Sequence, residues 1–228
     1  LVVFVLLFVF AAVVSGFFVA TFLFFLSFFC ELVVLPMYLL SGVWGSSTDV
    51  GTFLRTEEYG AMKLLFFLAG GSILVWFGIL ALYAESADLG AATFSLEGLG
   101  QLAESGQLDA DFQKWVFPLF MVGFGALAGL WPFHTWSPDG NVAAPTAVSM
   151  LHAGVLMKLG AYGIIRVGMF LLPEGADAWM PVLITLGSVN VIYGAMSAMS
   201  QNCTLYPSDP AAHTLSGGRG GLILIITP

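Results

Sequence analysis

Long apolar runs separated by short polar stretches constrain this sequence more than any other feature. A helix needs about 20 apolar residues to cross the hydrocarbon layer of a bilayer. Only 9% of the residues are charged, whereas roughly a quarter are charged in soluble domains. The sequence therefore predicts an all-α integral membrane protein, a bundle of about six transmembrane helices. The runs occupy residues 1–17, 20–44, 61–84, 113–136, 145–172 and 179–200.

The segments outside the apolar runs predict a surface helix and a C-terminal tail. Within the longest, "FSLEGLGQLAES" (94–105) predicts a helix at the membrane surface. A transmembrane module is expected at 1–200, followed at 201–228 by a polar, Gly-rich tail that is disordered or frameshifted. The first run lacks an initiator Met and a basic start, which predicts a helix cut at its front and hence a fragment. The net charge of −8 implies no nucleic-acid partner.

Ionisable residues inside apolar runs are the candidates for function. A charge at the centre of a membrane helix costs about 2.5–3.5 kcal/mol, so it normally faces the protein interior or a wet cavity. Glu31 lies near the middle of the second run and Lys158 near the middle of the fifth. Glu31 is either a proton-binding acid or a protonated glutamate that bonds a neighbouring helix. A lysine held between burial and a nearby carboxylate can accept and release protons, which arginine cannot easily do. Glu31 is one candidate for that carboxylate.

Two histidines and a second lysine are candidates for intermediate steps. His134 and His152 share the same few helices as the other ionisable residues, and the alternative for each is a satisfied core histidine. Lys63 begins the third run. Its relay role is the weaker interpretation, beside that of an interfacial anchor.

The stretch "FGALAGLWPFHTWSPDGN" (124–141) is the most distinctive backbone feature. Pro132 falls inside an apolar run and predicts a broken helix, whose loose carbonyls must be covered by protein or water. "SPDG" (137–140) predicts a turn, and Pro145 suits the first turn of the next helix. "GFGALAG" (123–129) follows no strand, so small residues for helix packing explain it better than a dinucleotide site. No cofactor-binding or metal site is predicted in this chain.

Two long motifs carry a resemblance to a known family. They are "WPFHTWSPDGNVAAPTAVSMLHAGVLMKLGAYGIIR" (131–166) and "FFCELVVLPMYLLSGVWG" (28–45). The sequence resembles the antiporter-like membrane subunits of proton-pumping NADH:quinone oxidoreductase, respiratory complex I, of the type called chain M or chain 4. The resemblance covers about residues 1–201. It implies part of a fourteen-helix antiporter-like fold with two inverted repeats, with helices four to nine present here and 45–60 and 137–144 facing the cytoplasm.

The resemblance also implies a function. The chain would translocate protons as an enzyme subunit that carries no redox chemistry itself. NADH, FMN, iron–sulfur clusters and quinone would bind in partner subunits. Its partners would be other membrane subunits of complex I and the lipid bilayer, in a bacterial-type inner (plasma) membrane that it crosses several times. The alternatives are a subunit of a multisubunit cation/proton antiporter and a non-functional gene fragment.

The resemblance assigns roles to three of the residues singled out above. Glu31 matches the family's glutamate in the fifth helix, and Lys158 matches the lysine of the eighth. His134 matches the histidine that follows the break in the seventh helix, which corresponds to residues 112–136.

The sequence departs from the family in three places. Leu127 stands where many members carry a lysine in the broken helix, so the central proton transfer would have to use His134, His152 or water instead. Asn141 stands where a histidine is common. After residue 201 the family continues with a loop and another apolar helix, and here a different tail follows.

Overall fold

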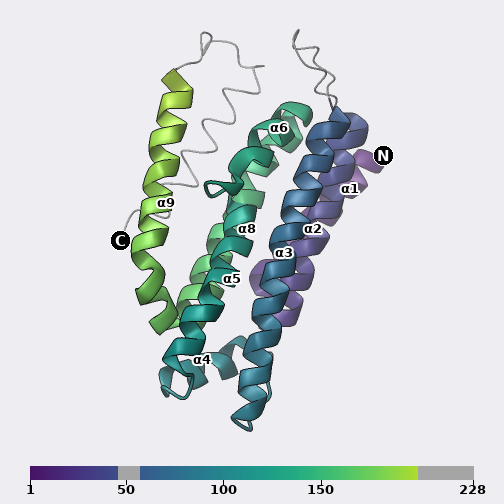
Figure 1. The fold of residues 1–228 in the computed structure, drawn as a ribbon. Coiled ribbons are helices and arrows are strands. Elements are labelled where there is room, and N and C mark those ends of the chain that lie inside the picture. Colours follow the sequence, from purple (N-terminus) through teal and green to yellow (C-terminus); the bar gives the residue numbers. More distant parts are fainter. Residues whose placement is uncertain (46–56, 200–228) are drawn as a thin grey trace.

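Helices make up almost all of the part of the chain that the computed structural model describes, which is residues 1–45 and 57–199 (Figure 1). Within these residues, six segments are long and apolar enough to cross a membrane. The prediction of an all-α membrane bundle is therefore confirmed. The predicted tail at 201–228 lies outside the described residues.

Each of the six predicted runs forms one of these segments. The first three are α1 (Val2–Val19), α2 (Leu23–Trp44) and α3 (Glu57–Asp88). The fourth comprises α5 (Ala110–Ala128), the short turn η1 (Phe133–Thr135) and α6 (Trp136–Ala143). The fifth comprises α7 (Thr146–Leu151), the π-helical η2 (His152–Leu156), α8 (Met157–Gly163) and the π-helical η3 (Ile164–Met169). The last is α9 (Pro173–Met199), which begins earlier than the predicted residue 179.

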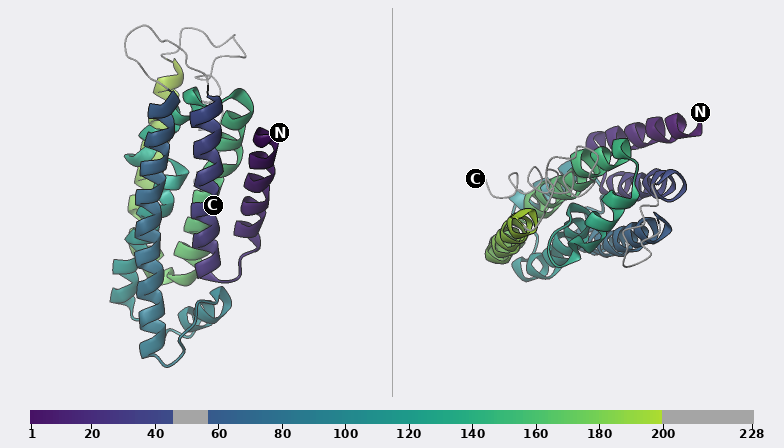
Figure 2. Two further views of the ribbon diagram at one scale, coloured as in Figure 1. Left: turned by 90° about the vertical axis from the view of Figure 1, so that its right-hand side faces the viewer. Right: turned by 90° about the horizontal axis from the view of Figure 1, so that it is seen from above.

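The central helix of the bundle is α5, which packs against α3, α8 and α9. Helices α1 and α9 lie at opposite edges (Figures 1 and 2). Small residues allow the central helices to approach closely: a Cβ atom on Gly123 would lie 2.6 Å from the Gly71 carbonyl oxygen of α3. This contact bears out the interpretation of "GFGALAG" as a helix-packing segment.

The amphipathic helix predicted between the third and fourth runs is α4 (Leu96–Glu104), at one end of the bundle (Figure 1). Its buried side includes Leu96 and Leu99. Two backbone hydrogen bonds tie its start to the link between α1 and α2, from Leu23 N to Phe94 O at 2.8 Å and from Leu96 N to Thr21 O at 2.9 Å. Helix α6 lies at the opposite end, beside the start of α3, so 137–144 and the start of α3 share one end of the bundle as the resemblance implied.

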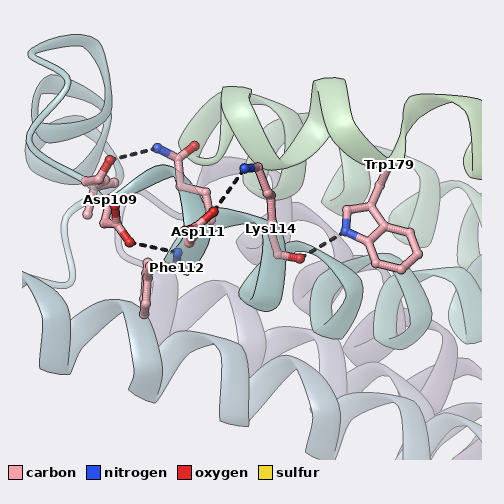
Figure 3. A network of polar contacts seen from close by, with 7 residues as sticks. Asp109, Asp111, Phe112, Lys114 and Trp179 are labelled. Atoms are coloured by element: carbon pink, nitrogen blue, oxygen red, sulfur yellow. Dashed lines mark hydrogen bonds and ion pairs between the residues drawn. The ribbon is translucent and has the colours of Figure 1, made fainter.

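Polar contacts fix the start of α5 against α9 at the α4 end (Figure 3). The Asp109 carboxylate caps α5 by accepting from Phe112 N at 3.3 Å, and Lys114 pairs with Asp111 at 3.0 Å. The Trp179 indole nitrogen donates to the Lys114 carbonyl oxygen at 2.9 Å. The start of α9 is thereby held in register with α5.

Candidate functional site

The fourth span is broken, as Pro132 predicts. Helix α5 ends at Ala128 because Gly129 adopts a left-handed conformation with φ +73°, which glycine accepts without strain. Pro132 then follows, and the chain becomes helical again at Phe133. The break separates a long helix from the short helix α6.

Side chains form hydrogen bonds with the backbone on both sides of the break. The buried Trp136 indole nitrogen donates to the Ala126 carbonyl oxygen at 2.8 Å. The Asn190 side chain of α9 serves both sides of the break, accepting from Trp131 N at 2.9 Å and donating to the Gly129 carbonyl oxygen at 3.3 Å. The sequence predicted that protein or water would cover these groups, but it gave no signal for Asn190.

The predicted turn at "SPDG" is wrong, because residues 137–140 belong to α6. Pro138 lies in the first turn of that helix, where a backbone N–H has no intrahelical acceptor to lose. Gly140 is buried, and a Cβ atom on it would lie 3.3 Å from Leu64 of α3. Packing against α3 therefore keeps this segment helical and turns Asp139 toward α3. Pro145, expected in the first turn of the next helix, lies just before Thr146 as its N-cap.

Lys63 of α3 pairs with Asp139 of α6. Their charged atoms lie 2.7 Å apart, and the two side chains are only 20% and 10% exposed. The Tyr59 ring lies 6.0 Å from the Lys63 ammonium nitrogen. Lys63 is thus engaged in a mostly buried ion pair. Asp139 is the residue that sequence reasoning missed.

His152 lies beneath α6 and is fully buried. Neither of its ring nitrogens has a hydrogen-bond partner among the described residues. It begins the π-helical segment η2. Beside it, the Asn141 amide donates to the Ser137 carbonyl oxygen at 2.8 Å and its oxygen accepts from the Ser149 hydroxyl at 3.2 Å. A polar layer therefore joins α6 to the fifth span, and His152 is not satisfied within it.

Lys158 is partly buried in α8. Its ammonium nitrogen lies 3.5 Å from the Ala153 carbonyl oxygen, a long hydrogen bond. A Cβ atom on Gly154 would meet no other atom within 4 Å, so there is open space one turn before Lys158. Within the described residues no ion pair joins Lys158 to Glu31. Glu31, which was one candidate for the counter-charge of Lys158, does not pair with it in the described structure.

Glu31 is exposed on the outside of the described helices. The Trp76 indole nitrogen of α3 donates to its carboxylate at 2.6 Å. Phe28 and Leu35, about one turn to either side on α2, are 47% and 56% exposed. Glu31 thus bonds a neighbouring helix, while its face of α2 points outward.

An apolar region separates α2 from α8. Leu127 and Phe124 of α5 line a cavity of about 10 Å³ together with Cys30 of α2 and Ser72 of α3, which is the size of roughly one water molecule. On its other side, Phe124 packs against Gly163 of α8. Side chains with ionisable groups do not line this cavity, apart from the thiol of Cys30.

His134 lies at the break itself. Its ring contacts the Tyr193 ring of α9, with centroids 4.7 Å apart, and its buried Nδ1 atom has no partner in the described part of the chain. The structure thus brings His134, His152 and Lys63 to the α6 end of the bundle. It does not bring Glu31 to Lys158.

Comparison with known proteins agrees with this architecture. The family described as NADH:quinone oxidoreductase/Mrp antiporter, TM, matches residues 20–203. One chain of respiratory complex I from Thermus thermophilus superposes with a TM-score of 0.74 at 22% identity, covering 96% of this chain and 42% of that one. A chain of the archaeal membrane-bound sulfane sulfur reductase gives a TM-score of 0.80 at 21% identity, with the same coverage. At such identities the structures show a shared fold.

Curated sequences are more similar. NAD(P)H-quinone oxidoreductase chain 4 3 of Picosynechococcus sp. is 37% identical over 187 residues, which is 82% of this chain and 31% of that protein. Chain 4-2 of Synechocystis sp. is 34% identical over 201 residues, or 87% of this chain and 33% of that protein. The chain spans about a third of the length of these relatives. With most of its residues matched, it belongs to the NADH:quinone oxidoreductase/Mrp antiporter family of membrane proteins.

Proposed function

We propose that this chain is part of a chain-4-type subunit of an NADH:quinone oxidoreductase, and that it translocates protons in step with electron transfer in other subunits. The observation that carries the proposal is Lys158, a partly buried lysine in a membrane span that pairs with no carboxylate among the described residues. A lysine is costly at this position unless protein or water compensates its charge, so its presence in a membrane span points to a role in transport. The identity to chain 4 proteins supports this function.

The other ionisable residues take supporting roles. Glu31, hydrogen-bonded to Trp76, is a second proton site. Because a carboxylate in a membrane normally faces protein or water, the outward face of α2 is assigned to contact with another membrane subunit. Leu127 and Phe124 of α5 place apolar side chains between the helices that carry Glu31 and Lys158. Protons therefore reach Lys158 from the α6 end, where His134, His152 and Lys63 lie.

The proposal extends to the other parts of the enzyme. NADH, FMN, iron–sulfur clusters and quinone are assigned to partner subunits, and the complex to a bacterial inner membrane. The family description also names Mrp antiporters, so a cation/proton antiporter subunit is the second candidate. Neighbouring genes for iron–sulfur and flavin subunits support the first candidate, and genes for small membrane subunits alone support the second.

The experiment that tests proton translocation replaces Lys158 in the complete subunit, within its assembled complex. Lys158→Arg keeps the charge but cannot release its proton, so the complex should assemble and pump poorly. Lys158→Ala should also pump poorly, and should assemble at least as well because a costly charge is gone. Proton uptake into membrane vesicles, normalised to assembled complex, is the measurement. Undiminished uptake with Lys158→Arg would rule out the relay.

A further inference from the structure

His152 is held in an unfavourable state. It is fully buried, and neither ring nitrogen has a partner in the described structure. A buried polar group without a hydrogen bond costs free energy, so native proteins rarely keep one without a functional reason. A histidine that water reaches at only one stage of a transport cycle would be buried without a partner at the other stages. The question is then what covers His152.

Helix α6 covers it. A Cβ atom on Gly140 would lie 3.9 Å from Cε1 of the His152 ring. On the same helix, Asn141 accepts a hydrogen bond from Ser149, which lies about one turn before His152. The inner side of α6 is thus the layer between His152 and that end of the bundle.

Helix α6 is short, and it is not continuous with the helices before and after it. The break around Gly129 and Pro132 separates it from α5, and the link at Ala144 and Pro145 separates it from α7. Against α3 it is held by the ion pair of Lys63 with Asp139 at 2.7 Å. Close packing accompanies the pair, since a Cβ atom on Gly60 would lie 2.7 Å from the Asp139 carbonyl oxygen.

We propose that α6 is a lid over His152 and that the Lys63–Asp139 ion pair holds it closed, which makes Asp139 a positioning residue for proton uptake. When the pair separates, α6 moves away from α3 and water reaches the His152 ring, which then passes its proton toward Lys158 in the same span. The role of the lid in proton uptake rests on the proposed proton translocation. The closing of the lid by the ion pair is a structural statement that can be tested without any pumping.

The first experiment measures access to position 152. In the assembled complex with Cys30 and Cys203 replaced by alanine, His152→Cys is exposed to a membrane-impermeant thiol reagent. Adding Asp139→Asn should raise the modification rate about tenfold, as expected when a partly buried ion pair is lost. The reversed pair, Lys63→Asp with Asp139→Lys, should bring the rate back down.

Two further variants keep this measurement decisive. Asp111→Asn breaks the exposed Lys114–Asp111 pair at the other end of the bundle and should leave the rate unchanged. Lys63→Met removes the α3 partner of the ion pair. If Asp139→Asn fails to assemble, the rate is measured with Lys63→Met instead. A rate that responds to neither Asp139→Asn nor Lys63→Met would overturn the lid.

The second experiment locks the lid. Cysteines at positions 64 and 140 would join α3 to α6, because a Cβ atom on Gly140 would lie 3.8 Å from Leu64 Cβ, a separation that suits a disulfide. Oxidation should abolish proton uptake and reduction should restore it. The matched control joins α2 to α3 by cysteines at positions 42 and 61, whose Cβ atoms would lie 3.3 Å apart, and it leaves α6 unlinked.

The outcomes separate the two proposals. Full proton uptake with the α3–α6 disulfide formed would overturn the lid, because α6 would not need to move. Full uptake with Lys158→Arg would overturn the proposed proton relay and leave the measurement at position 152 valid. A control disulfide between α2 and α3 that blocked uptake as strongly as the lock would also contradict a specific role for α6.

Discussion

The Trp76 indole nitrogen donates a hydrogen bond to the Glu31 carboxylate at 2.6 Å, and it thereby joins α3 to α2 at an outward-facing acid. Trp76 thus fixes the position of a carboxylate that has no cationic partner among the described residues. The two residues can be separated by mutation, because one supplies the acid and the other supplies the donor.

Glu31→Gln should separate proton binding from assembly. Glutamine keeps an oxygen that accepts from Trp76 but cannot titrate, so the complex should assemble while proton uptake falls by about 10²-fold, as for loss of a proton-transfer group. Glu31→Asp should be tolerated better. Trp76→Phe should instead lower stability by about 1–3 kcal/mol, with exposed Trp115→Phe as its control. Full pumping with Glu31→Gln would return Glu31 to a structural role.

The sequence predicted the spans and the break because both depend on local chemistry. A run of apolar residues must be long enough to cross a bilayer, and Pro132 comes three residues after Gly129, which permits the left-handed turn that ends α5. Asp139 was missed for the opposite reason. "SPDG" fits a turn, and only the packing of Gly140 and Asp139 against α3 keeps it helical.

The sequence could not predict which side chains of different helices contact one another. Helices that are apolar all round carry little periodic signal for which face is buried. The rotation of α2 that turns Glu31 outward, away from Lys158, is set by the packing of whole helices. Likewise Asn190 became recognisable as a partner of the break only once α9 was placed beside Gly129.

The orientation of the spans can be tested by labelling. Glu58 is exposed at the start of α3, and Glu97 is exposed in α4 at the opposite end of the bundle. Single cysteines at these two positions, in a background without Cys30 and Cys203, should react with an impermeant reagent from opposite sides of the membrane. Vesicles of both orientations provide the comparison. Labelling of both from one side would contradict the α3 span.

Asn190 should be important for stability. Asn190→Leu leaves the exposed Trp131 N–H and the buried Gly129 carbonyl oxygen without their partner, and the loss at Gly129 should cost about 1–3 kcal/mol. The midpoint of thermal unfolding of the purified complex should fall. Ser188→Ala is the matched control on α9, since that exposed hydroxyl bonds only the Ile184 carbonyl oxygen of its own helix among the described groups. Equal midpoints for both variants would mean that water replaces Asn190 at the break.

Two glycines of the fifth span should respond oppositely to the same substitution. A Cβ atom on Gly160 would lie 2.4 Å from Ala128 N and 2.5 Å from the Phe124 carbonyl oxygen, both backbone atoms of α5 that cannot rotate away. Gly160→Ala should therefore force α8 from α5 and destabilise the complex by about 1–3 kcal/mol. A Cβ atom on Gly154 would meet nothing within 4 Å.

Gly154→Ala should consequently cost no stability and can add up to about 1 kcal/mol, because alanine restricts the unfolded chain and favours helix. The comparison is made in the complete complex from the midpoint of thermal unfolding of each variant. A methyl group at position 154 narrows the open space one turn before Lys158, so proton uptake by Gly154→Ala is measured in parallel. A loss of uptake at unchanged stability means that this space carries water to Lys158. If Gly154→Ala destabilises as strongly as Gly160→Ala, another helix occupies that space in the complex.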